Sequence, residues 1–193
     1  MGTVTEFKTG EDVVTYLKHQ HKQIKGLLAR VLESTGDERQ TAFADLRRML
    51  AVHETAEEEI VHPLARALPG GDAEVADRLK EENAAKTALI ALEKLDVDSV
   101  PFETKFRALE ADVLAHAERE ETLEFDRLGS KLDSTKLKRM KKAVELAESI
   151  APTRPHPGIE SAAGNLLAGP FVSMVDRTRD ALSDRPSHKH SHR

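Results

Sequence analysis

The chain has 193 residues, a length that fits one domain with a tail and can bury a core without covalent cross-links. It contains no cysteine, which excludes disulfides, thiolate nucleophiles and cysteine-ligated clusters, so any bound metal must be held by histidines and carboxylates. Acidic and basic residues are well mixed at a formal net charge of -5, which gives no basic footprint for nucleic acid or anionic lipid.

Hydrophobic periodicity predicts four long helices, over residues 11–34, 38–68, 72–95 and 101–129. The breakers STGDE, PGGD and DVDSVP separate them, and connections this short suit antiparallel neighbours. A shorter helix, 134–150, begins after a cap-like Asp133 and ends before the connector APTRPHPG. The predicted fold class is therefore all-α, an antiparallel up-down four-helix bundle with an additional short helix and an irregular C-terminal tail.

The segment boundaries divide the chain into a bundle domain, 11–150, and a C-terminal extension, 151–193, which contains prolines and glycines. Within the extension, 159–183 is predicted to be an amphipathic segment, and the His-rich end is predicted to be disordered. The first residues carry acids and lack an apolar signal region, and no stretch is long enough for a membrane span. We expect a cytoplasmic protein, a monomer or weak dimer, with neither nucleic acid nor membrane as a partner.

An internal repeat relates the second and fourth helices. HETAEEEIVHPLARAL, starting at His53, aligns without gaps on HAEREETLEFDRLGSK, starting at His116. The two HxxxE motifs, His53 with Glu57 and His116 with Glu120, lie 63 residues apart, and the preceding helices echo each other at a similar separation. The pattern predicts two helical hairpins related by a pseudo-twofold axis.

Both HxxxE pairs fall inside the apolar stripe of their helix on a wheel of roughly 100° per residue. Residues at i and i+4 lie one above the other, so each His and Glu can converge on one point in the interior. His21 falls inside the stripe of the first helix, whereas His19 points the opposite way. Buried ionisable groups cost several kcal/mol each unless they are paired or bound to metal. Five in one small bundle predict a pair of cations between the helices.

The third helix offers no inward histidine; Glu82 and Lys86 occupy the centre of its stripe, in the segment KEENAAK. We expect Glu82 to act as the replacement ligand, and an internal ion pair between Glu82 and Lys86 is the alternative. On the same wheel, His62 faces away from the core, and Glu58 and Glu121 are expected on solvated flanks as fallback ligands. Tyr16 lies at the edge of the apolar stripe of the first helix. We expect it either to pack in the core or to donate a hydrogen bond near the metal.

With these motifs the chain resembles the haemerythrin-like (HHE cation-binding) domain family over about residues 11–129. HETAEEEIVHP and HAEREETLEF are similar to its second and fourth motifs. The resemblance implies a centre of two iron ions, non-haem and oxo- or hydroxo-bridged. Its terminal ligands would be His21, His53 and His116, with Glu57 and Glu120 as bridges. The chain departs from the family pattern at the third helix, where a histidine is expected near position 83. Glu82 in its place would favour ferric iron and weaken reversible O2 carriage.

Three functions of different class remain open. The first is a di-iron oxidoreductase that decomposes hydrogen peroxide or uses it to oxidise nitric oxide. The second is a protein that binds, stores or senses O2, NO or iron without turnover, and the third is a metal-free structural bundle. The small ligands O2, NO and hydrogen peroxide are the expected partners, and no motif identifies an electron donor. A ferritin-like centre would need two inward ExxH motifs, and a zinc peptidase would need HExxH, which is absent.

Overall fold

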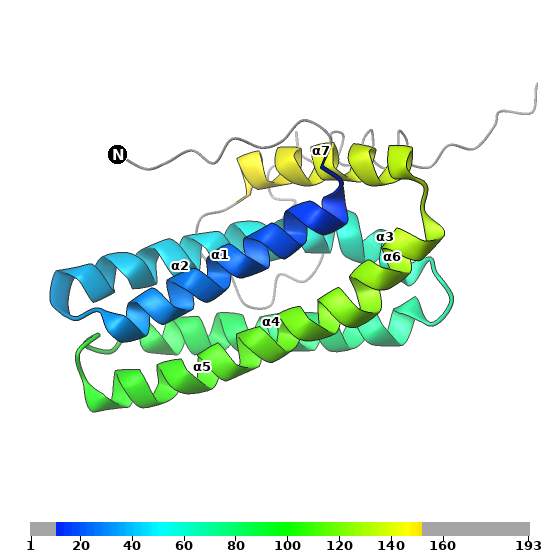
Figure 1. Ribbon diagram of the computed structural model, residues 1–193. Coiled ribbons are helices and arrows are strands. Elements are labelled where there is room, and N and C mark those ends of the chain that lie inside the picture. Colours follow the sequence, from blue (N-terminus) through cyan, green and yellow to red (C-terminus); the bar gives the residue numbers. More distant parts are fainter. Residues whose placement is uncertain (1–10, 152–193) are drawn as a thin grey trace, which may run out of the picture.

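The computed structural model describes residues 11–151, a stretch made of helices and their connections without any strand. Figure 1 shows the helices as long rods. The first rod is α1 (Val13–Glu33). The second is continuous through α2 (Gly36–Ala56), the π-helix η1 (Glu57–Val61) and α3 (His62–Arg66). The third is α4 (Gly71–Leu92). The fourth runs through α5 (Val100–Arg119), the π-helix η2 (Glu120–Phe125) and α6 (Asp126–Lys131), and α7 (Ser134–Ile150) follows.

These boundaries confirm the five helices expected from periodicity, to within a few residues at each end. Capping side chains explain where α1 and α7 begin. The Asp12 side chain accepts from the backbone N–H of Thr15, and Asp133 accepts from that of Lys136. Gly70 turns the chain at a φ of 81°, and a Cβ on Gly71 would lie 1.9 Å from a backbone carbonyl oxygen, so both positions require glycine. The predicted segment 159–183 lies outside the described residues.

The rods pack in pairs, and α7 covers one of them. α1 lies along α2, and α4 lies along α5. Figure 1 shows α7 across the α1–α2 pair, on the side away from α4 and α5, where it contacts α1, α2 and η1. The fifth helix is therefore packed on the same body as the other four.

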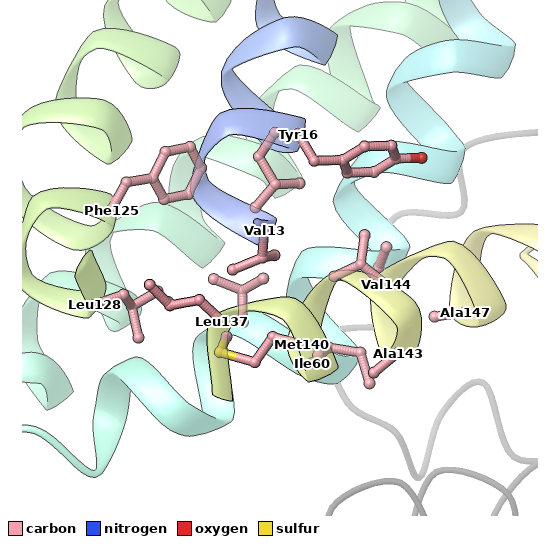
Figure 2. Packing of buried hydrophobic residues seen from close by; sticks show 13 residues of the cluster. Val13, Tyr16, Ile60, Phe125, Leu128, Leu137, Met140, Ala143, Val144 and Ala147 are labelled. Carbon is pink, nitrogen blue, oxygen red and sulfur yellow. The ribbon is translucent and has the colours of Figure 1, made fainter. Parts of the chain in front are cut away.

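Two apolar clusters occupy opposite ends of the interior. One joins the beginning of α1 to the π segments, α6 and α7, and Figure 2 shows Ile60, Phe125 and Met140 among its side chains. The other fills the far end around Leu28, Phe43 and Phe106. The inward histidines and glutamates lie between the two clusters along the rods. The apolar groups thus hold a polar layer in the middle of the protein.

The two π segments occupy equivalent positions in the internal repeat, each beginning at the Glu of its HxxxE motif. A π turn accommodates one extra residue, which rotates everything after it by about 100° relative to an uninterrupted α-helix. A helical wheel with a regular α-helical period does not include this rotation, and it places Leu123 and His62 on the wrong face. Leu123, which an uninterrupted helical period would place on the same face as His116 and Glu120, is 45% exposed, and Phe125 is buried in its place.

His62 is the second correction. Five residues after Glu57, it would lie about 140° from that residue on a continuous α-helix, facing solvent. The extra residue in η1 reduces the separation to about 40°, and His62 is only 2% exposed. Glu59, three residues before it, is also buried. The π segment therefore brings an additional histidine into the interior.

Candidate metal centre

Four buried or nearly buried histidines share one orientation in the polar layer. Each Nδ1 lies within hydrogen-bond distance of an oxygen on a neighbouring helix. The pairs are His21 with Glu121 at 2.9 Å, His53 with Gln20 at 2.8 Å, His62 with Glu124 at 2.9 Å and His116 with Glu81 at 2.9 Å. An imidazole that donates from Nδ1 to such an acceptor leaves its Nε2 lone pair available to a cation. The arrangement thus directs four Nε2 atoms inward.

The first group of converging ligand atoms joins three rods. His21, His53, Glu57 and Glu120 each offer one atom, and these atoms lie within 4.8 Å of one another. The two Nε2 atoms of His21 and His53 are 3.1 Å apart, too close for both to carry protons comfortably. Glu57 Oε2 lies 3.3 Å from His53 Nε2, and Glu120 Oε2 lies 3.3 Å from His21 Nε2. This is the spacing expected of ligands around a shared ion.

The second group adjoins the first through Glu120. His62, Glu82 and Glu120 also offer atoms that lie within 4.8 Å of one another. His62 Nε2 is 2.7 Å from Glu82 Oε1, and His116 Nε2 is 3.1 Å from the second oxygen of Glu120, Oε1. Glu120 therefore belongs to both groups, with Oε2 facing His21 and Oε1 facing His116.

The donor set fits cations because several of its buried polar atoms have no hydrogen bond. Among the described residues, no hydrogen bond satisfies either carboxylate oxygen of Glu57 or Glu120, Oε2 of Glu82 or Nε2 of His116, although all are buried. An unsatisfied buried polar atom costs about 1–3 kcal/mol, and a charged one costs more. Histidine and carboxylate ligands suit iron and manganese. The layer is therefore complete only when positive charge is bound there.

In the metal-free protein, the pKa values of the inward histidines are shifted by burial and by the neighbouring carboxylates. Burial alone would lower the pKa of His116, but the Glu120 carboxylate raises it to about 10. Burial likewise opposes the charged form of His62, yet Glu82 raises its pKa well above the usual value. Burial, followed by the neighbouring His21, lowers the pKa of His53 to about 3. Protons on His62 and His116 thus partly compensate the carboxylates.

Lys86 is buried beside this layer, and its main partners are not the ones expected. Its Nζ forms a close ion pair with Glu58, and it lies 3.9 Å from both Glu54 Oε2 and Glu82 Oε2. The expected contact between Lys86 and Glu82 exists, but it leaves Glu82 Oε1 available to His62. Glu58 is not on a solvated flank, since its side chain is 4% exposed. Lys86 and the carboxylates around it form a charged cluster at the edge of the layer.

A cavity of about 220 Å³ opens beside the histidines. Its walls include Ile24, Leu50 and Val113, and its polar lining includes His21, His53, Glu54, Glu82 and His116. Asp112 and Arg119 also line it, and Arg119 Nη2 lies 2.9 Å from Glu81 Oε1. A small molecule in this cavity would meet three of the inward histidines.

The predicted ligand residues come together, with one unexpected addition. His21, His53, Glu57 and Glu120 converge directly; His116 lies against Glu120, and Glu82 is in the adjoining group. His19 lies outside, as expected, with its side chain 56% exposed. His62 was not expected at the site, because only the π turn brings it inward, and neither were the carboxylates that hold the outer nitrogens. Glu121, expected on a solvated flank, is one of those carboxylates.

Comparison with known proteins gives one family and one fold relative. The family model described as "Hemerythrin HHE cation binding domain" matches residues 12–128. A solved structure of a hemerythrin HHE cation-binding domain-containing protein from Mycobacterium kansasii is similar, with a TM-score of 0.62 and 20% identity; the match covers 87% of this chain and 99% of that one. A comparison with curated protein sequences finds no significant match. Between residues 11 and 151, no helix has the length and hydropathy that a membrane crossing requires.

Proposed function

Since the chain belongs to the hemerythrin HHE cation-binding domain family, we propose that its polar layer holds two iron ions that act on hydrogen peroxide. The reaction would be decomposition of peroxide to water and O2, or peroxide-dependent oxidation of nitric oxide. The observation that carries the proposal is the pair of adjoining ligand groups that share Glu120 and have unsatisfied buried oxygens. Bound iron would supply open coordination positions and redox capacity for a small ligand.

We assign the ligands residue by residue. His21 and His53 would hold one ion, His62, Glu82 and His116 would hold the other, and Glu57 and Glu120 would serve as shared carboxylates. His62 is the addition to the set expected from the sequence, and it supplies the imidazole that the third helix lacks. The outer partners of the histidines hold their rings in place before any ion arrives, which lowers the cost of ordering the site.

The cavity supports the choice of a small substrate. Its volume of about 220 Å³ is several times the roughly 30 Å³ that one liquid water occupies, so peroxide and its products can share it. Its walls combine the apolar side chains of Ile24, Leu50 and Val113 with the inward histidines. The buried Lys86 adds positive charge beside the Glu54 and Glu82 carboxylates. Its ammonium group cannot itself bind a metal. These features favour turnover of a small neutral oxidant.

The proposal also includes the finer arrangement of the protein. We propose an antiparallel up-down order of the four rods, a monomer or weak dimer in the cytoplasm, and residues 151–193 as an appendage outside the metal-binding domain. The short connections between successive rods support the first of these. Deleting residues 152–193 should leave the iron content unchanged; loss of iron would place part of that segment at the site.

The test measures metal and turnover on the same preparation. We expect about two irons per chain by elemental analysis, near-ultraviolet bands that change on adding peroxide, and O2 release followed by an oxygen electrode. His53→Ala and His116→Ala should each lose iron and turnover, whereas the matched control His19→Ala should lose neither. Iron that is bound without O2 release or nitric oxide consumption would leave O2, NO or iron binding without turnover as the function. Unchanged iron content in both site variants would refute the centre.

A further inference from the structure

One of the four inward histidines is held differently from the others. Three donate from Nδ1 directly to a carboxylate, but His53 meets the side-chain oxygen of Gln20, at 2.8 Å. Gln20 Nε2 in turn donates to Glu148 Oε1 at 2.6 Å, and the Tyr16 hydroxyl donates to Glu148 Oε2 at 2.5 Å. The carboxylate that completes this arrangement comes from the last turn of α7, outside the four rods.

The chemistry of each group fixes the direction of this chain of hydrogen bonds. An ionised carboxylate can only accept, so Glu148 requires the amide NH2 of Gln20 to face it. The carbonyl oxygen of Gln20 must then face His53, and this oxygen can only accept. His53 therefore donates from Nδ1, and its Nε2 is left without a proton, facing His21 and Glu57. No link of this sequence can be reversed while Glu148 is ionised.

We propose that Glu148 is a positioning residue for the metal centre: acting through Gln20, it fixes the Nδ1–H tautomer of His53. The inference rests on the proposed metal centre for its consequence, but the tautomer itself is a property of the metal-free protein. It gives the fifth helix a role beyond packing. The helix holds the outer end of a hydrogen-bond chain whose inner end is a metal ligand.

The packing around α7 holds Glu148 where this role requires it. Val144 and Ala147 are buried against the beginning of α1. Figure 2 shows the Tyr16 ring beside Val144, with its hydroxyl directed toward the Ala147 end of the helix. Gln20 is itself buried, so bulk water does not compete for its amide. The helix thus presents one carboxylate to two side chains of α1 that lie one turn apart.

Replacing Glu148 by glutamine removes the directional constraint without changing the size of the side chain. A glutamine at 148 can offer either its oxygen or its NH2 to Gln20, so the amide of Gln20 can turn over. With its NH2 toward His53, Gln20 would accept no proton, and the imidazole would carry its proton on Nε2, where the ion must bind. Glu148→Leu goes further and removes the acceptor altogether.

The experiment measures first the tautomer of His53 and then the affinity for Fe²⁺. Imidazole nitrogen chemical shifts of the metal-free protein, labelled with ¹⁵N-histidine, distinguish Nδ1–H from Nε2–H at His53. We expect the unaltered chain to show Nδ1–H alone, and Glu148→Gln and Glu148→Leu each to show a mixture of Nδ1–H and Nε2–H. Anaerobic titration with Fe²⁺ should show about a tenfold loss of affinity in Glu148→Leu, the low end of what loss of a ligand's outer partner costs.

Two controls separate positioning from packing. Tyr16→Phe removes the other partner of the same carboxylate and should keep the Nδ1–H tautomer. Glu145→Gln changes a carboxylate of the same helix that bonds to Lys141, and it should have no effect on His53. If Glu148→Leu does not fold, the isosteric Glu148→Gln variant decides the question.

The inference is overturned if His53 keeps Nδ1–H alone in the folded Glu148 variants. Failure of the underlying function would be seen elsewhere. A chain that shows the expected tautomers but binds no Fe²⁺ would refute the iron centre and leave the positioning of His53 intact.

Discussion

His62 offers the sharpest test of the structure, because the sequence and the structure place it on opposite sides of its helix. In the metal-free protein its ring lies between two buried carboxylates, with Nε2 2.7 Å from Glu82 and Nδ1 2.9 Å from Glu124. Replacing it by leucine leaves both carboxylates buried without their partner. Removal of one member of a buried ion pair costs about 3–5 kcal/mol. A histidine on the solvent face would cost no more than about 0.5 kcal/mol.

The pH of the assay follows from the pKa shifts. The pKa of His62 is raised well above 6.5, so its contribution is fully present below 6.5 and is lost as the pH rises through the folded-state pKa. Burial opposes the charged form of Glu82, but His62 lowers its pKa, so its contribution is present above 4.5 and is lost as the pH falls. Both contributions are therefore retained at a pH between 4.5 and 6.5.

The assay is urea unfolding of the metal-free protein in a chelator, at a pH inside that window. We expect His62→Leu to lower the free energy of unfolding by about 3–5 kcal/mol. The control His19→Leu changes an exposed histidine of α1 and should stay within about 0.5 kcal/mol of the unaltered chain. A His62→Leu variant as stable as that control would refute the inward orientation of His62 and the rotation assigned to η1.

Three further predictions test the site and its support. Glu82→Gln should lower the iron content by one ion per chain while Asp77→Asn, an exposed change on the same helix, leaves it unchanged; elemental analysis checks both. Iron affinity should rise with pH, roughly tenfold per unit for each proton released, because His116, with its pKa raised to about 10, must lose a proton to bind; titrations with Fe²⁺ at several pH values would contradict this if affinity were flat. Met140→Ala should cost about 2–5 kcal/mol of stability, since the side chain is buried in the apolar cluster that α7 covers, whereas Leu146→Ala, 39% exposed on the same helix, should cost well under half of that in the same denaturation assay.

The sequence by itself determined the helices and most of the inward ligands. Helix boundaries follow from caps, glycines and apolar periodicity, which act over a few residues. The pairs His53 with Glu57 and His116 with Glu120 end at the first residue of each π segment, before the extra residue can rotate the helix. The inward position of His21 is likewise a property of α1 alone. These predictions needed no knowledge of how the rods pack.

Only the tertiary structure decided the remainder of the site. The π turns follow the Glu of each motif and rotate His62 inward, where Glu82 and Glu124 contact it from other rods. The periodicity of one helix carries no record of such a turn. Gln20 and Glu148 are separated by 128 residues, and only the packing of α7 on α1 brings them together. Local sequence patterns record which face of a helix is apolar; the partner that meets a polar side chain on that face is set by packing over the whole chain.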